Sequence, residues 1–148
     1  MSNIDNSTKV EQLLTKHYCV IDFLPEQVKA GNGGQFFEVE KFFLSGKQRE
    51  KLYQKFANTL LKLNCYHDFE VCRCDLDFWD INPSPYDLVF WLLDGEPLCV
   101  VLKDADAMIS INGDDTHMTL YNPSHELIEL TRAIASSEGL FVWEPNPD

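Results

Sequence analysis

The chain has 148 residues, of which 45% are hydrophobic and 12% aromatic, and its formal net charge is -12. This size and apolar content fit one domain with a proper core, and the ten Phe and three Trp argue against a disordered chain. No apolar run approaches the roughly 18 to 20 residues of a membrane helix and the chain does not open on a secretory signal pattern, so we expect a cytoplasmic protein with reduced cysteines and no membrane partner.

Short elements are predicted before residue 45. Apolar residues at helical spacing indicate a helix over 8–16. Alternating side chains predict a strand over 17–24, followed by a glycine-containing loop over 25–34. That Gly-rich loop lacks the pattern of a phosphate-binding loop. Aromatic residues and the preceding Gly pair favour a strand over 35–44.

The clearest helix signal covers 46–63. Ser45 and Gln48 form a capping-box pattern at its start, and Asn64 predicts a left-handed stop at its end. One face carries an apolar stripe made of Leu52, Tyr53, Phe56, Ala57, Leu60, Leu61 and Leu63. The opposite face carries Lys47, Lys51, Lys55 and Lys62, which either dock an acidic partner or simply face solvent.

Beyond this helix the hydrophobic period changes to two. Strands are predicted over 67–74, 87–94, 97–103, 107–112 and 116–121. Asp94-Gly95 and Asn112-Gly113 predict hairpin turns. The runs 88–93 and 98–102 are apolar at every position, so both are expected as central strands that are covered on each face.

A second main helix is predicted to begin at the cap residue Asn122 and to end at Gly139, with Pro123 in its first position. A last strand is expected over 140–144. The order of elements predicts a single α+β domain over 1–148, with flexible ends at 1–7 and 145–148. We expect a mostly antiparallel sheet of about five to seven strands with the two main helices packed on it.

The negative charge is concentrated in the second half of the chain. Residues 1–74 carry ten Lys or Arg against nine Asp or Glu, whereas residues 75–148 carry two against fifteen. Such a half-chain would repel phosphates, which disfavours nucleic acid as a partner. It suits a basic protein partner or bound cations, and it also suits an acidic surface that serves only solubility.

Three of the five cysteines gather just after the long helix. Cys65, His67, Cys72 and Cys74 have zinc-ligand chemistry, but their C-x-H-x4-C-x-C spacing differs from the C-x2-4-C pairs of structural zinc sites. In a strand over 67–74, His67 and Cys72 also point to opposite faces, so the four would converge only if the strand were broken. We therefore predict no metal and no other cofactor, and interpret the thiols as core packing.

A catalytic thiol is also disfavoured. His17 and Cys19 lie on one face of a predicted strand with Cβ atoms about 7 Å apart, too far for a hydrogen bond without rotation of both side chains. Cys99 lies inside an apolar run, where a thiol is inert. No catalytic residue is assigned.

Carboxylates at alternating positions follow the cysteines. Asp75, Asp77 and Asp80 carry oxygen ligands for calcium or magnesium, but the calcium-loop pattern fails at its Gly and Glu positions. Partner contacts usually combine charge with aromatic rings. The expected contact residues are Asp75, Asp77, Trp79, Asp80 and Tyr86.

Three functional hypotheses follow. The leading one is a non-catalytic cytosolic binding protein (an inhibitor, adaptor or immunity-type protein) that presents its acidic half to a basic protein partner. The alternative is a small enzyme or ligand-binding domain with a pocket between the helices and the sheet, assisted by a metal on Asp75 and Asp77. The third is a homodimer in which the mildly basic long helix of one subunit meets the acidic half of another.

Overall fold

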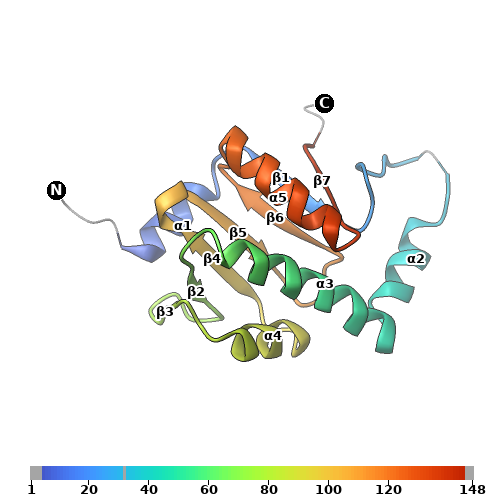
Figure 1. Cartoon of the computed structure of the whole chain (residues 1–148). Helices are drawn as coiled ribbons and strands as arrows, with labels where there is room; N and C mark the ends of the chain where they lie inside the picture. The colour runs from blue at the N-terminus through green and yellow to red at the C-terminus, as the bar shows by residue number, and fades with distance from the viewer. Residues whose placement is uncertain (1–4, 32, 146–148) are drawn as a thin grey trace.

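Strands from both halves of the chain form one sheet, and helices lie on it (Figure 1). The computed structural model describes residues 5–31 and 33–145. The strands are β1 (Tyr18–Asp22), β2 (Glu70–Cys72), β3 (Asp80–Ile81), β4 (Leu98–Leu102), β5 (Ala107–Ile111), β6 (His117–Tyr121) and β7 (Phe141–Trp143). The helices are α1 (Asn6–Leu13), α2 (Phe36–Phe43), α3 (Gly46–Asn64), α4 (Pro85–Leu93) and α5 (His125–Ser137), with a 3-10 turn at Lys103–Ala105.

The strands lie in the order β3-β2-β4-β5-β6-β1-β7, and all neighbouring pairs are antiparallel. β1 is inserted between β6 and β7, so an early strand joins the last two. β5 and β6 form the hairpin predicted at Asn112-Gly113. The α+β class and the mostly antiparallel sheet are confirmed, with α3 and α5 as the two main helices.

The main core lies between one face of the sheet and α3, α4 and α5. Alternation along the strands decides which residues face it: Ile21 of β1, Met118 of β6 and Val100 of β4 all point this way. From the long helix, Phe56 and Leu60 are fully buried against them. The apolar stripe predicted on this helix therefore forms the centre of the molecule.

The opposite face of the sheet carries a second, smaller core under α1. Val10 and Leu13 of the helix pack on Val101 of β4 and Met108 of β5, with Trp79 at the margin. Toward β1 and β7 the same face is hollowed rather than filled, and an open depression of about 370 Å³ lies beside α1. The two faces of the sheet are therefore covered to different extents.

α4 replaces the central strand predicted over 87–94. The Ser84 hydroxyl caps it by accepting a hydrogen bond from the Asp87 N–H at 3.1 Å. Helical spacing leaves Phe90 exposed, and the predicted hairpin turn is instead the helix exit, where Gly95 has φ 84°. The buried residues of α4 are Leu88, Trp91 and Leu92. An all-apolar run fits a helix as well as a strand, and here the cap favours the helix.

α2 replaces the strand predicted over 35–44. Phe43 packs against the main core, and its ring centroid lies 5.0 Å from that of Phe23. Phe37 and Phe42 remain exposed. The aromatic residues of α2 therefore divide between a face that contacts the core and a face in solvent, as in an amphipathic helix. This correction places an aromatic helix beside the loop that follows β1.

Two predicted capping interactions do not form, although Ser45 is the N-cap residue of α3. Ser45 precedes α3, but its hydroxyl donates to the Lys41 carbonyl at 2.6 Å instead of capping the new helix. Asn122 follows β6 with φ 57°, and the cap of α5 is Ser124, whose hydroxyl accepts from the Leu127 N–H at 3.1 Å. Pro123 therefore precedes the helix and is not in its first position.

The other elements lie where they were predicted, with shifted ends, except for the short edge strand β3, which was not predicted. α3 runs one residue past its expected end, and Cys65 follows it with a right-handed φ of -66°, so the left-handed stop at Asn64 is wrong. α5 does stop at Gly139, which has φ 77°. Residues 1–4 and 146–148, which belong to the ends predicted to be flexible, lie outside the described residues, while Asn6 already begins α1. None of the helices in the described ranges combines the length and apolar content that crossing a bilayer requires.

Candidate functional site

The segment between β2 and the end of α4 exposes acidic and apolar side chains together. We call residues 75–90 the acidic aromatic segment. It begins in the loop after β2, includes the edge strand β3 and ends on α4 (Figure 1). Its exposed acids are Asp75, Asp77, Asp80 and Asp87. Its exposed apolar residues are Leu76, Phe78, Ile81, Tyr86 and Phe90, with Phe78 at 73% and Tyr86 at 88% exposure.

Local hydrogen bonds fix the first part of this segment. The Asp75 carboxylate accepts from the Asp77 N–H at 2.9 Å, and the Asp75 carbonyl accepts from the Phe78 N–H at 3.1 Å. The Trp79 indole donates to the Leu76 carbonyl at 2.6 Å, while its ring packs against the second core. The exposed rings and acids are therefore carried by a loop with a defined shape.

Asn82 ties the same segment to the body of the protein. It adopts φ 45°, a left-handed conformation that Asn tolerates better than most residues. Its side-chain oxygen accepts from the Phe69 N–H at 2.8 Å and from the Asn64 amide at 3.1 Å. Its amide donates to Asp68 at 3.0 Å. These bonds hold β3 against β2 and the end of α3.

A small pocket of about 230 Å³ opens within the acidic aromatic segment. Carboxylates at its wall come from Asp75, Asp80 and Glu96, and Phe78 supplies an apolar side. Arg73 is the basic residue of this wall, and its guanidinium lies 3.7 Å from Glu96 and 4.5 Å above the ring of Trp91. The pocket therefore keeps an excess of negative charge beside an apolar surface.

The predicted contact residues all lie within this segment, and their role in binding stays a prediction. Asp75, Asp77, Asp80 and Tyr86 are exposed, whereas Trp79 is half-buried and acts as a packing anchor. Sequence reasoning missed three further exposed apolar residues of this segment: Phe78, Ile81 and Phe90. Their position beside the acids was the signal that could have found them.

The four candidate metal ligands do not form a site. Cys65 is exposed at the end of α3, and Cys74 is exposed beyond β2. His67 lies 3.1 Å from Asp104 instead, and Cys72 is buried in β2 opposite Cys99. Residues 5–31 and 33–145 contain no group of three or more His, Cys, Asp or Glu side chains that could hold a metal ion.

The buried thiols are poor nucleophiles. Burial raises the pKa of the Cys19 thiol to about 11, and the nearby Glu144 charge acts in the same direction. Burial also raises the pKa of Cys72 to about 11, and it raises the pKa of Cys99. The His17 ring nitrogen Nε2 donates to the Pro123 carbonyl, 3.1 Å away, and does not contact a thiol. Thiolates are therefore scarce at neutral pH in these positions.

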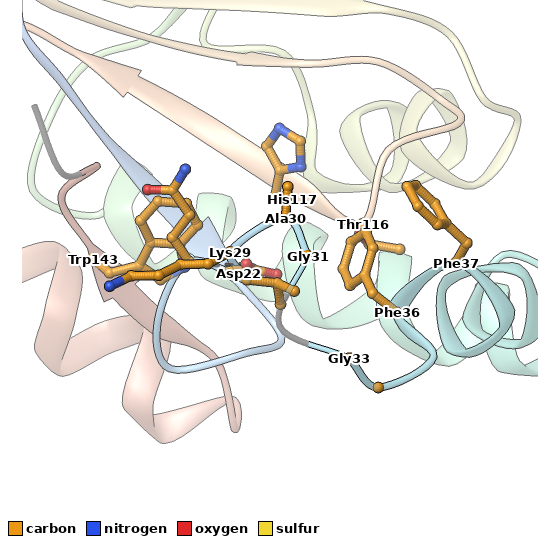
Figure 2. Close-up of a pocket in the computed structure, with 13 residues that line it drawn as sticks. Asp22, Lys29, Ala30, Gly31, Gly33, Phe36, Phe37, Thr116, His117 and Trp143 are labelled. Atoms are coloured by element: carbon orange, nitrogen blue, oxygen red, sulfur yellow. Dashed lines mark hydrogen bonds between the residues drawn. The ribbon is translucent and has the colours of Figure 1, made fainter. Parts of the chain in front are cut away.

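A second candidate site lies at the other edge of the sheet. An open cavity of about 510 Å³ is lined by the end of β1, the start of β6, β7, loop residues 27–31 and 33–34, and α2. Figure 2 shows Trp143 on one side of it and Phe36 and Phe37 on the other, with Asp22 and His117 between them. In the described part of the loop, Gly31, Gly33 and Gly34 each have φ 82° with open space where a Cβ would stand, so the backbone itself forms the wall.

Asp22 is the polar centre of this cavity. Its side chain accepts a hydrogen bond from the Trp143 indole N–H at 3.0 Å, and it lies directly opposite His117 in the β1–β6 register. Backbone N–H groups of Phe23 and Leu24 donate to the same carboxylate. Burial raises the pKa of Asp22 above the ordinary 3.8, and the hydrogen bonds and the charge of His117 offset only part of this effect.

A polar contact holds α2 beside the cavity. The buried Thr116 hydroxyl, at the start of β6, lies 3.4 Å from a carboxylate oxygen of Glu40 on α2. This link joins the sheet to the helix that carries Phe36. Sequence reasoning missed the cavity because its walls come from four separate stretches, although a carboxylate that ends an apolar strand, as Asp22 does, is an unusual residue at that position.

Comparison with protein-family models, with curated proteins and with solved structures finds no match for this chain. The function is therefore inferred from these two surfaces.

Proposed function

We propose that the chain is a non-catalytic binding protein that presents the acidic aromatic segment to a basic protein partner, as an inhibitor, adaptor or immunity-type protein of the cytoplasm would. The observation that carries this proposal is the exposure of acids and large apolar side chains on one fixed segment, with Phe78 at 73% and Tyr86 at 88% exposure.

Exposed rings on a fixed loop favour a protein partner. When a partner covers large exposed apolar side chains, their removal from water lowers the free energy of the complex. Patches of this kind commonly mark interaction sites. The loop bonds of Asp75 and the anchor at Asn82 reduce the ordering entropy that binding would otherwise cost. Aromatic residues of this kind are frequent among the few that dominate interface energies.

The acids favour a basic partner. Four carboxylates lie exposed among the rings, in a half-chain that carries two bases against fifteen acids. Complementary charge speeds diffusional encounter and makes association sensitive to salt. The same field repels nucleic-acid phosphates.

The small pocket suits one long basic side chain. Asp75, Asp80 and Glu96 supply carboxylates, and Phe78 offers an apolar face for the aliphatic stem of a lysine or arginine. Arg73 is already engaged by Glu96 and by the ring of Trp91, so its charge is partly compensated. We therefore place the partner's anchoring cation in this pocket.

Two variants with the same change in net charge test the proposal. The segment variant combines Asp77→Asn, Asp80→Asn and Phe78→Ser. The control variant combines Glu11→Gln, Asp114→Asn and Phe42→Ser, which removes two exposed acids and an exposed ring elsewhere. Each variant and the unmodified protein serve as bait in the native lysate at low and high salt.

We expect one basic protein to be recovered at low salt by the unmodified protein and by the control variant. The segment variant should lose it by about tenfold or more, because interface rings and charges at the centre of a contact each contribute more than 1 kcal/mol. Equal recovery by all three baits, or no recovered protein at low salt, contradicts the proposal.

The homodimer is a weaker candidate. Lys47 and Lys51 of α3 are exposed, but Lys62 is paired with Glu138 of α5 at 2.6 Å. The basic face is therefore partly neutralised within the chain. Light scattering on the eluted protein at both salt concentrations decides this, since a monomer at each concentration removes the dimer.

The second candidate function is ligand binding, and the observation that favours it is the 510 Å³ cavity around Asp22. A metal on Asp75 and Asp77 is not part of it, because the Asp75 carboxylate accepts the Asp77 N–H and these residues belong to the distant segment. Elemental analysis of protein purified without chelator checks this: about one metal per chain would restore the metal-assisted alternative.

A further inference from the structure

Among the described residues, the buried carboxylate of Asp22 forms no ion pair with Lys or Arg, and the basic side chain whose charge acts on it is His117, opposite it in the β1–β6 register. Asp22 is 8% exposed, and none of the ion pairs formed within residues 5–31 and 33–145 includes it. Its hydrogen-bond donors are neutral: the Trp143 indole and two backbone N–H groups. A buried charge is costly unless a cation compensates it, and here the space beside it is a cavity.

Aromatic rings form the walls around this carboxylate. Trp143 stands on one side and Phe36 on the other, and Phe37 lies at the mouth (Figure 2). Ring faces carry negative potential, so they attract cations and stack with other rings. A cavity of about 510 Å³ falls within the range of small-molecule sites and exceeds what one amino-acid side chain fills.

We propose that this cavity binds a small organic cation with a planar ring, whose basic group pairs with Asp22 and whose ring stacks between Trp143 and Phe36. This site is separate from the acidic aromatic segment and does not depend on it.

The other charged groups do not favour an anion. Glu40 adds a second carboxylate on the α2 side, through its contact with Thr116. The Lys29 side chain is exposed and ends beside Trp143, on the side away from Phe36 (Figure 2). A solvated ammonium is screened by water, whereas the charge of buried Asp22 is not. The His117 ring lies next to Asp22 across the strands and offers a further polar contact.

Benzamidine is a suitable probe, since it joins a benzene ring to a planar cation that pairs with carboxylates through two N–H groups. Binding is followed by two-dimensional NMR of the ¹⁵N-labelled full chain. The Trp143 indole N–H reports directly, because it donates to Asp22. The indoles of Trp79 and Trp91 lie in other parts of the fold and act as internal controls.

We expect benzamidine to shift the Trp143 indole and the Gly33 and Gly34 amides in a saturable way. Neutral benzamide keeps the ring without the charge, and agmatine keeps the charge without the ring. Each should bind at least about tenfold more weakly than benzamidine. Asp22→Asn should abolish the preference for benzamidine over benzamide, while Asp114→Asn, an exposed acid outside the cavity, should leave it unchanged.

Three results would overturn the proposal. They are the absence of any saturable shift at Trp143, benzamide binding equal to that of benzamidine, and a saturable shift confined to Trp79 or Trp91. If agmatine binds as tightly as benzamidine, the proposal is also overturned, because the ligand then needs no planar ring. Such a site would suit a basic side chain of a protein. The comparison of the three probes uses the unmodified protein, so it stands even where Asp22→Asn fails to fold.

Discussion

Single carboxylates in this protein work in two different environments. Asp77 and Asp80 stand in water, where their charges act on approaching molecules over about 8–10 Å. Asp22 is buried between β7 and β6, where desolvation raises its pKa. The exposed carboxylates contribute to the rate at which a partner approaches, whereas the buried carboxylate can contribute to one specific ionic contact. The net charge of the chain describes neither role.

The raised pKa of Asp22 predicts a pH-dependent stability. The folded protein binds the Asp22 proton more tightly than the unfolded chain does, so this group stabilises the fold below the ordinary pKa of 3.8. That contribution is lost as the pH rises through the raised folded pKa. Relative to Asp22→Asn, the unmodified protein should therefore lose unfolding free energy as the pH increases from acid toward neutral.

Urea unfolding followed by circular dichroism over this pH range measures the difference. Asp114→Asn removes one negative charge from an exposed turn and serves as the control, whose curve should run parallel to that of the unmodified protein. Parallel curves for Asp22→Asn and the unmodified protein, or a difference of opposite slope, contradict the assignment of a buried charged carboxylate.

At the scale of elements, the turn after α4 and the β5–β6 hairpin turn approach so closely that there is no room for a side chain at Gly113. Arg49 of α3 donates to the carbonyls of Leu93 and Gly113, each at 2.9 Å, and joins the end of α4 to the β5–β6 hairpin. At Gly113 an added Cβ would lie within 2.6 Å of the Cα of Gly95. The sequence predicted Asn112-Gly113 as a hairpin turn. It did not predict that Gly113 must also lack a side chain because the backbone of Gly95, distant in sequence, lies against it.

Gly113→Ala should therefore destabilise the fold by about 1–3 kcal/mol, because one backbone must move away from the other. Chemical unfolding measures this, with Asp114→Ala at the next, exposed position as the control. A loss no greater than that of the control would show that the two turns do not touch in solution.

Sequence patterns predicted an element well where one face is buried and the other is polar. They predicted it poorly where apolar residues stand at every position and no hydrophobic period can be seen. α3 was predicted because its apolar stripe repeats at helical spacing from Leu52 to Leu63. In α4 every residue from 88 to 93 is apolar, so no period was visible, although the Ser84 cap and the following Pro85 indicate a helix start. In α2 the aromatic content favoured a strand, and contact of Phe43 with the core overrides that preference.

At the scale of the whole molecule, the two candidate sites lie at opposite edges of one sheet. The acidic aromatic segment contains β3, at one edge, whereas the cavity lies against β1 and β7, at the other. The charge count over residues 75–148 pointed toward the first site, since acids near one another in sequence remain near one another on a loop. The second site joins residues 22, 36 and 143, and only the folded sheet brings them together.

Hydrogen–deuterium exchange on the chain with and without its recovered basic partner tests the central claim most directly. We predict slower exchange at amides within 75–82 and on the exposed side of α4, with the core of α3 and α5 unchanged. Protection confined to α3 and α5, or to the loop over 27–34 around the cavity, would contradict the assignment of the acidic aromatic segment as the partner-binding surface.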